Sequence, residues 1–223
     1  MLAINLKAYK EAIGESAIKI LEAAEKVLEE SGLNIPIVIA PQYTDIYPLA
    51  KIAKRVMIFA QHMDPIEPGA FTGHVLSDAI KEAGAKGVIL NHSEKQMSIE
   101  NIEKAINIAK KLGLTTIVCA NDPVVAEAIS ILNPDYIAVE PPELIGTGVS
   151  VSKAKPDVVK NAVEWVKECN PKVKVLVGAG ISSKEDVKKA LELGADGVLL
   201  ASAVAKDKNP YVKIKELIEG FMK

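Results

Sequence analysis

Three side chains suited to acid–base chemistry lie at or just after the ends of short apolar runs in this sequence. They are Lys7, His92 and Glu140. A carboxylate that ends an apolar strand is costly to bury unpaired, so Glu140 has either a structural partner or a pKa tuned for proton transfer. We favour the second interpretation, which predicts a base at this position.

Lys7 and His92 also have simpler interpretations. A lysine after a strand is commonly a solvated surface residue, and a single histidine is commonly a hydrogen-bonded structural residue. His92, however, lies between an apolar run and the expected start of a helix, where its charge state would be biased. Their positions make both residues candidates for the same chemistry.

Small residues follow the last two apolar runs, as Gly178-Ala179-Gly180 and as Ala201-Ser202. Such residues let a ligand approach the backbone, and backbone N–H groups near a helix N-terminus bind phosphate. The glycines could instead be simple turn residues. They are a poor match to a dinucleotide fingerprint, because its last glycine is missing and the string lies near the C-terminus. We favour a phosphate site.

Composition argues against several other functions. With 27 Lys and Arg residues against 29 Asp and Glu, the formal net charge is −2, so no strong field recruits nucleic acid or an anionic membrane. Cys119 and Cys169 match neither a zinc spacing nor a disulfide framework, and we expect no metal. No apolar stretch could span a bilayer and no signal peptide is recognisable, so we expect a cytoplasmic protein.

The elements that must position these residues are apolar runs alternating with longer amphipathic segments. Most runs are apolar on both faces, which is typical of parallel strands covered by helices. Eight strands are expected, at residues 2–6, 35–40, 56–60, 87–90, 115–119, 136–139, 173–177 and 198–200. Helices are expected between them, among them residues 15–30, 99–112, 124–132, 156–168 and 184–193.

This alternation has two main solutions, an open doubly wound sheet or a closed barrel. Eight strands with no element left over favour an α/β fold of the (β/α)8 barrel type. Residues 1–223 are expected to form one domain, because no linker divides them. Such barrels typically have about 250 residues, so some helices must be short, and their active sites lie at the carboxyl ends of the strands. The candidate residues would then share one face.

Four strings, NLK from Asn5, GAFTG from Gly69, NHSEK from Asn91 and VEPPELIGTG from Val139, resemble motifs of triosephosphate isomerase in their order and strand positions. The resemblance runs from Asn5 to Ser202 and is to the compact archaeal branch of that family. It implies a single-domain TIM barrel with a shortened helical layer. It also implies interconversion of dihydroxyacetone phosphate and D-glyceraldehyde 3-phosphate through an enediolate, without metal or organic cofactor, in glycolysis and gluconeogenesis.

The resemblance assigns a role to each matching residue. Glu140 would be the base that moves a proton between two substrate carbons. His92 would be the electrophile that polarises the carbonyl, and this family is itself the usual example of a neutral imidazole in that role. Lys7 would stabilise negative charge on the enediolate. The implied substrate contacts are Asn5, Lys7, Gly180, Ala201 and Ser202, together with Ile145 and Gly146 in the loop that closes over the phosphate. Glu94 would be structural, paired with Lys7 or a neighbouring loop.

The sequence departs from the family pattern in three places. Val177 and Gly180 replace a tyrosine and a serine that latch the closed loop in many members. The consecutive prolines Pro141-Pro142 should stiffen the hinge of that loop. Ala201-Ser202 replaces paired glycines, which puts phosphate binding in doubt only if that turn requires positive φ.

Assembly is also implied by the resemblance, because in the family the GAFTG segment reaches into a neighbouring subunit. We therefore expect a homo-oligomer, and the short helices favour a tetramer. His62 and His74 lie in the same long loop and are expected on the contact surface. Cys119 and Trp165 are expected to pack rather than to react.

Two other functions remain open. Lyases, epimerases and synthases share this kind of phosphate site, but they commonly carry several acidic or metal-binding residues at strand ends. A phosphate-binding barrel without catalysis would be expected to lack Glu140 or His92, and both are present.

Overall fold

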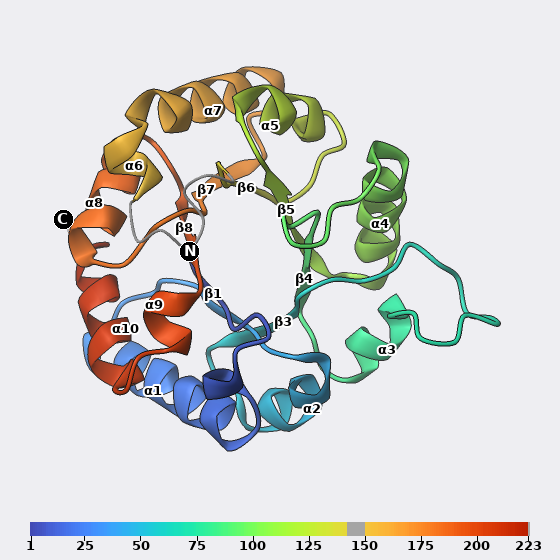
Figure 1. Ribbon diagram of the computed structural model, residues 1–223, viewed down its shortest axis with the longest axis horizontal. Coiled ribbons are helices and arrows are strands. Elements are labelled where there is room, and N and C mark those ends of the chain that lie inside the picture. Colours follow the sequence, from blue (N-terminus) through green and yellow to red (C-terminus); the bar gives the residue numbers. More distant parts are fainter. Residues whose placement is uncertain (142–149, 223) are drawn as a thin grey trace.

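The computed structural model describes residues 1–141 and 150–222, which form a closed barrel of parallel strands surrounded by helices (Figure 1). Each strand pairs with the next along the chain, and the last pairs with the first. The strands are β1 (Leu2–Asn5), β2 (Ile37–Ala40), β3 (Met57–Ala60), β4 (Gly87–Leu90), β5 (Thr115–Ala120), β6 (Tyr136–Val139), β7 (Lys174–Val177) and β8 (Gly197–Leu200). The predicted barrel and its predicted strands are confirmed, with small shifts at the strand ends.

Helices cover the outside of the barrel. They are α1 (Glu15–Ser31), α2 (Tyr43–Ile52), α3 (Ser77–Glu82), α4 (Ile99–Leu112), α5 (Pro123–Ser130), α6 (Val151–Ala154), α7 (Pro156–Cys169), α8 (Lys184–Glu192), α9 (Ser202–Ala205) and α10 (Pro210–Glu219), with a 3-10 turn at Lys10–Ala12. The helices predicted as α1, α4, α5, α7 and α8 are confirmed. Among the described residues, no helix is both long and apolar enough to cross a membrane.

Capping residues set several helix ends. The Ser98 hydroxyl accepts a hydrogen bond from the Asn101 N–H at the start of α4, and Ser183 forms a capping box with Asp186 at the start of α8. Gly113 ends α4 in the left-handed conformation, at φ 66°. These caps therefore fix where α4 and α8 begin and where α4 ends.

The interior of the barrel is filled by side chains. Successive residues of a strand point to opposite faces, so alternate residues point inward. The inward cluster consists of Met1, Ala3, Val38, Ala40, Phe59, Ile89, Ile117, Cys119, Ala138, Leu176 and Leu199. A larger cluster packs the outer faces of the strands against the helices. The barrel is therefore a packed core, and a ligand must bind at the ends of the strands.

Candidate active site

A cavity of about 170 Å³ opens at the carboxyl ends of the strands. The predicted site residues that line it are Asn5, Lys7, His92, Glu140, Gly180, Ala201 and Ser202. Ile145 and Gly146 lie outside the described residues. The structure therefore brings every predicted site residue that it describes to one cavity. It adds Tyr9, Gly178, Ile181, Ser182, Leu199, Leu200 and Ala203 to the lining.

Glu140 continues β6 into the cavity, where its backbone N–H donates to the Ala120 carbonyl at 2.8 Å. The residue is only 3% exposed, and its Oε2 has no hydrogen-bond partner among the described residues. Burial raises the pKa of Glu140, and His92, the Cys119 thiol and Lys7 offset this only in part. A buried oxygen without a partner, on a carboxyl group with a raised pKa, suits a base that accepts a proton from a ligand.

Replacing Glu140 with Gln is expected to stabilise the fold at pH 8. Because the folded-state pKa of Glu140 is raised, its protonated form stabilises the fold at low pH, and that contribution is lost as the pH rises through the folded pKa. Gln carries no charge and avoids this loss. The melting temperature should rise by about 2–4 °C for each kcal/mol recovered.

Calorimetry of both proteins at pH 4 and pH 8 tests this. The gain should be larger at pH 8, and Glu103→Gln, at an exposed position of α4, should show no such pH-dependent gain. An equal or smaller gain at pH 8 would mean that the ionised carboxylate is not destabilising.

His92 faces Glu140 across the cavity, with its Nε2 3.6 Å from Oε2 of the carboxyl group. The other ring nitrogen, Nδ1, accepts a hydrogen bond from the backbone N–H of Glu94 at 3.1 Å. A neutral imidazole that accepts at Nδ1 carries its proton on Nε2. His92 therefore presents an N–H donor on the side of the ring that faces Glu140.

Asn91 fixes the chain that carries His92. It adopts φ 55°, a left-handed conformation that asparagine tolerates better than most residues. Its side-chain amide donates to the Cys119 carbonyl at 2.9 Å and accepts from the Met97 N–H at 2.9 Å. Both ends of the β4–α4 connection are thereby tied to this one side chain.

Lys7 brings a positive charge to the same cavity. Its side chain is 12% exposed, and its Nζ lies 2.7 Å from Oε1 of Glu94. Of the two partners predicted for Glu94, Lys7 or a neighbouring loop, the structure shows Lys7. Its backbone has φ 48°, which is unfavourable for a residue with a long side chain. The Asn5 side chain supports this conformation by accepting the Lys7 N–H at 2.9 Å.

Two glutamines complete the support of Lys7. The side-chain amides of Gln42 and Gln61 both donate to the Lys7 carbonyl, at 2.6 and 2.9 Å. Gln61 also donates to the Ala40 carbonyl at 3.0 Å, which ties the Lys7 turn to the end of β2. Neither glutamine was predicted from the sequence. Each follows closely after a strand, and this same criterion identified Lys7 and His92.

Gly178 makes room for the base. A Cβ atom added to Gly178 would lie 2.3 Å from Cγ and 2.8 Å from Oε1 of Glu140. Atoms cannot approach so closely, and the backbone of Gly178 is held by its N–H bond to the Val139 carbonyl at 2.9 Å. Gly178 is predicted from the sequence as part of the phosphate turn, and in the structure it also limits where the Glu140 side chain can lie.

Gly178→Ala is therefore expected to displace the Glu140 carboxyl group and to lower turnover by about 10-fold to 100-fold, since misplacement by roughly 1 Å costs about that much. The melting temperature distinguishes misplacement from unfolding. Ala179→Gly, one residue further along the same turn, is the comparison. Wild-type turnover in Gly178→Ala would contradict the close packing.

The opposite end of the cavity carries the small residues. Gly180 adopts φ 71°, a conformation that glycine adopts without strain, and Ser202 begins α9 directly after Ala201. Ala201 has φ −135°, so the replacement of a glycine at this position needs no positive φ. The first N–H groups of a helix have no partner within the helix and are available to an anion.

Together these features define a class of protein. A (β/α)8 barrel whose strand ends gather a buried carboxyl group, an imidazole with a fixed N–H donor and an ammonium group is a barrel enzyme equipped for proton transfer. Within the described residues there is no group of three His, Cys, Asp or Glu side chains that could hold a metal ion.

Comparison with known proteins identifies the family within this class. The family model described as triosephosphate isomerase matches residues 1–219. The chain is 54% identical to the triosephosphate isomerase of Methanocaldococcus jannaschii, over 98% of this chain and 99% of that protein. It is 49% identical to the Methanothermus fervidus enzyme, over 98% and 97% of the two chains. The chain belongs to the triosephosphate isomerase family and is an isomerase that interconverts triose phosphates.

A solved structure agrees with the fold. The crystal structure of triosephosphate isomerase from Bartonella henselae matches with a TM-score of 0.77 at 18% identity, and the match covers 100% of this chain and 98% of that one. The resemblance stated from the sequence motifs is therefore confirmed at the level of the family and of the barrel.

Proposed function

We propose that Glu140 is the base and His92 the electrophile with which this chain interconverts dihydroxyacetone phosphate and D-glyceraldehyde 3-phosphate. The observation that carries the proposal is the partnerless Oε2 of Glu140, buried in the cavity 3.6 Å from Nε2 of His92. A substrate between these groups would meet a proton acceptor and a hydrogen-bond donor.

The reaction moves two hydrogen atoms. The Glu140 carboxylate takes a proton from carbon 1 of dihydroxyacetone phosphate while the electron pair of the C–H bond moves toward the carbonyl at carbon 2. The Nε2–H of His92 polarises that carbonyl and exchanges protons between the two oxygens of the enediolate. Glu140, now protonated, returns a proton to carbon 2. Lys7 stabilises the negative charge that develops on the enediolate oxygens.

The phosphate of the substrate would bind at the far end of the cavity. Gly180, Ala201 and Ser202 are proposed to provide backbone donors there, and Asn5 a polar contact near the reacting carbons. Ile145 and Gly146 remain proposed contacts on the strength of the sequence motif. The proposal requires neither metal nor organic cofactor, because every proton transfer has a side chain assigned to it.

A coupled assay tests the activity. Purified protein should convert glyceraldehyde 3-phosphate to dihydroxyacetone phosphate at the same rate with and without a chelator, and Glu140→Gln should abolish the conversion. A folded wild-type protein that binds the phosphate ligand without turnover would support a non-catalytic barrel instead. Activity that needs a metal would favour a lyase or epimerase of the same fold.

We further propose that the chain is a single-domain, cytoplasmic protein that assembles into a homo-oligomer, with a tetramer favoured. Two features of the surface support assembly. The segment between β3 and α3 extends away from the barrel and carries the exposed Phe71 (Figure 1). A second group of exposed apolar side chains, Ile99, Val124 and Ile131, lies on and after α4 and α5. The mass in solution by light scattering distinguishes a tetramer from a dimer or monomer of 23.8 kDa chains.

A further inference from the structure

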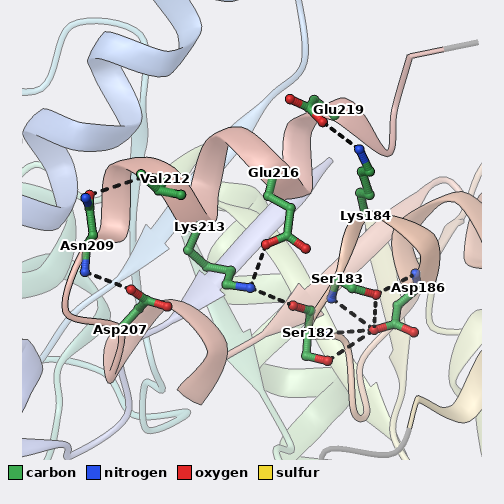
Figure 2. A network of polar contacts seen from close by, with 10 residues as sticks. All are labelled: Ser182, Ser183, Lys184, Asp186, Asp207, Asn209, Val212, Lys213, Glu216 and Glu219. Carbon is green, nitrogen blue, oxygen red and sulfur yellow. Dashed lines mark hydrogen bonds and ion pairs between the residues drawn. The ribbon is translucent and has the colours of Figure 1, made fainter.

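A buried carboxylate lies just outside the phosphate end of the cavity. It belongs to Asp186, in the first turn of α8, which is 3% exposed. Its Oδ2 accepts hydrogen bonds from the backbone N–H groups of Ser182 and Ser183, both at 3.0 Å, and from their hydroxyls at 3.2 and 2.9 Å (Figure 2). One oxygen thus holds two consecutive residues of the turn that follows β7.

Capping of α8 explains only part of this arrangement. A capping box requires the contacts between Ser183 and Asp186, and it does not require any contact with Ser182. Ser182 lines the cavity, and its carbonyl accepts a third bond, from Nζ of Lys213 on α10 at 3.1 Å. Lys213 is itself paired with Glu216 at 2.7 Å (Figure 2). The backbone and the hydroxyl of Ser182 are therefore held from outside the cavity.

The second oxygen of Asp186 points to another element. Its Oδ1 lies 2.6 Å from Nζ of Lys153 on α6, and the Ser152 hydroxyl donates to the Asp186 carbonyl at 3.5 Å. This ion pair ties α6, through Lys153, to the turn that lines the phosphate end. Burial alone would raise the pKa of Asp186, but the bonds from Lys153, Ser182 and Ser183 outweigh it and the pKa is lowered. The Asp186 carboxyl group is therefore ionised at neutral pH.

We infer that Asp186 and Lys153 are positioning residues for phosphate binding: they set the Gly180–Ser183 turn against α6, and neither touches the substrate. The inference rests on the proposed function. Its physical basis is the division of work between the two carboxylate oxygens. Oδ2 caps α8 and holds the turn, while Oδ1, which the cap does not need, binds Lys153 of α6.

Lys153→Met tests the link, because it removes the ammonium group and leaves the capping box intact. The Lys153 side chain is 52% exposed, so water screens the ion pair and a modest effect is expected. KM and the inhibition constant of glycerol 3-phosphate should each rise by about threefold to fivefold, while kcat stays within about twofold of wild type. Lys153→Arg should restore both constants.

The matched control is Lys184→Met, which removes a lysine of α8 that forms an ion pair with Glu219 at 3.0 Å, away from Lys153 (Figure 2). It should leave KM unchanged. An active wild type with unchanged KM in Lys153→Met, or a fall in melting temperature without any change in KM, would overturn the inference. An inactive wild type would instead overturn the proposed function.

Asp186→Asn provides a second and independent variant. The amide oxygen can still accept from Ser182 and Ser183, while the NH₂ group would face Lys153, so the cap survives and the link is lost. The same rise in KM is expected, and the double variant with Lys153→Met should show no further rise, because both changes break one contact. Additive effects would mean that the two residues do not act through each other.

Discussion

Glu140→Asp is expected to lower kcat by about 100-fold or more, with KM changed by less than about threefold, because it withdraws the carboxyl group by one carbon and a misplacement of order 1 Å costs about 100-fold in rate. Charge and chemical type are preserved in this variant. The cavity at this point is held by the close approach of Gly178, so the backbone has little freedom to bring the shorter side chain forward.

Steady-state kinetics on the variant measure this effect. Glu103→Asp, at an exposed position of α4, is the matched control and should be indistinguishable from wild type. If Glu140→Asp turns over within a few-fold of wild type, Glu140 is not the group that takes the proton, and the assignment of the base is wrong.

Lys7→Met is expected to reduce both affinity and rate, each by about 10-fold to 100-fold, since an ionic hydrogen bond contributes about 1.5–3 kcal/mol and every 1.4 kcal/mol is tenfold. The ammonium group attracts the dianionic substrate and stabilises the charged intermediate, so its loss affects both steps. Met has a similar length and leaves the packing of the stem largely in place.

The dependence of kcat/KM on ionic strength distinguishes the loss of the Lys7 charge from a change in the shape of the site. The kcat/KM of wild type should fall as salt is added, and that of Lys7→Met should fall less. Lys86→Met, at the exposed amino end of β4 and thus at the opposite mouth of the barrel, is the control for net charge. Unchanged binding of a phosphate ligand in Lys7→Met would place the ammonium group outside the site.

Local sequence patterns were sufficient to predict the barrel. Each strand is a short run that is apolar on both faces, and Ser98 and Gly113 mark the two ends of α4, so strands and helices could be counted before their arrangement was known. The barrel then brings the strand ends together, which is why Lys7, His92 and Glu140 could be assigned to one site from their order alone.

The geometry of the groups within the site could not be predicted in the same way. The conformation of Lys7 depends on Gln42 and Gln61, which reach it from other strand ends, and the tautomer of His92 depends on the Glu94 N–H. These contacts depend on side-chain directions in the folded barrel and leave no periodic signal. Asp186 has one contact of each kind. Its capping role can be predicted from its spacing to Ser183 along the chain, but its pairing with Lys153 depends on the fold.

The most direct test of the central claim follows the proton itself. Dihydroxyacetone phosphate is converted in D₂O, the product is trapped as it forms, and deuterium at its carbon 2 is measured by NMR. If Glu140 carries the proton by way of an enediolate, part of the product carries solvent deuterium at carbon 2, because the carboxyl group exchanges its proton before returning one. Equal deuteration by Glu140→Gln, at an equal rate, would mean that another group is the base, and that result contradicts the account.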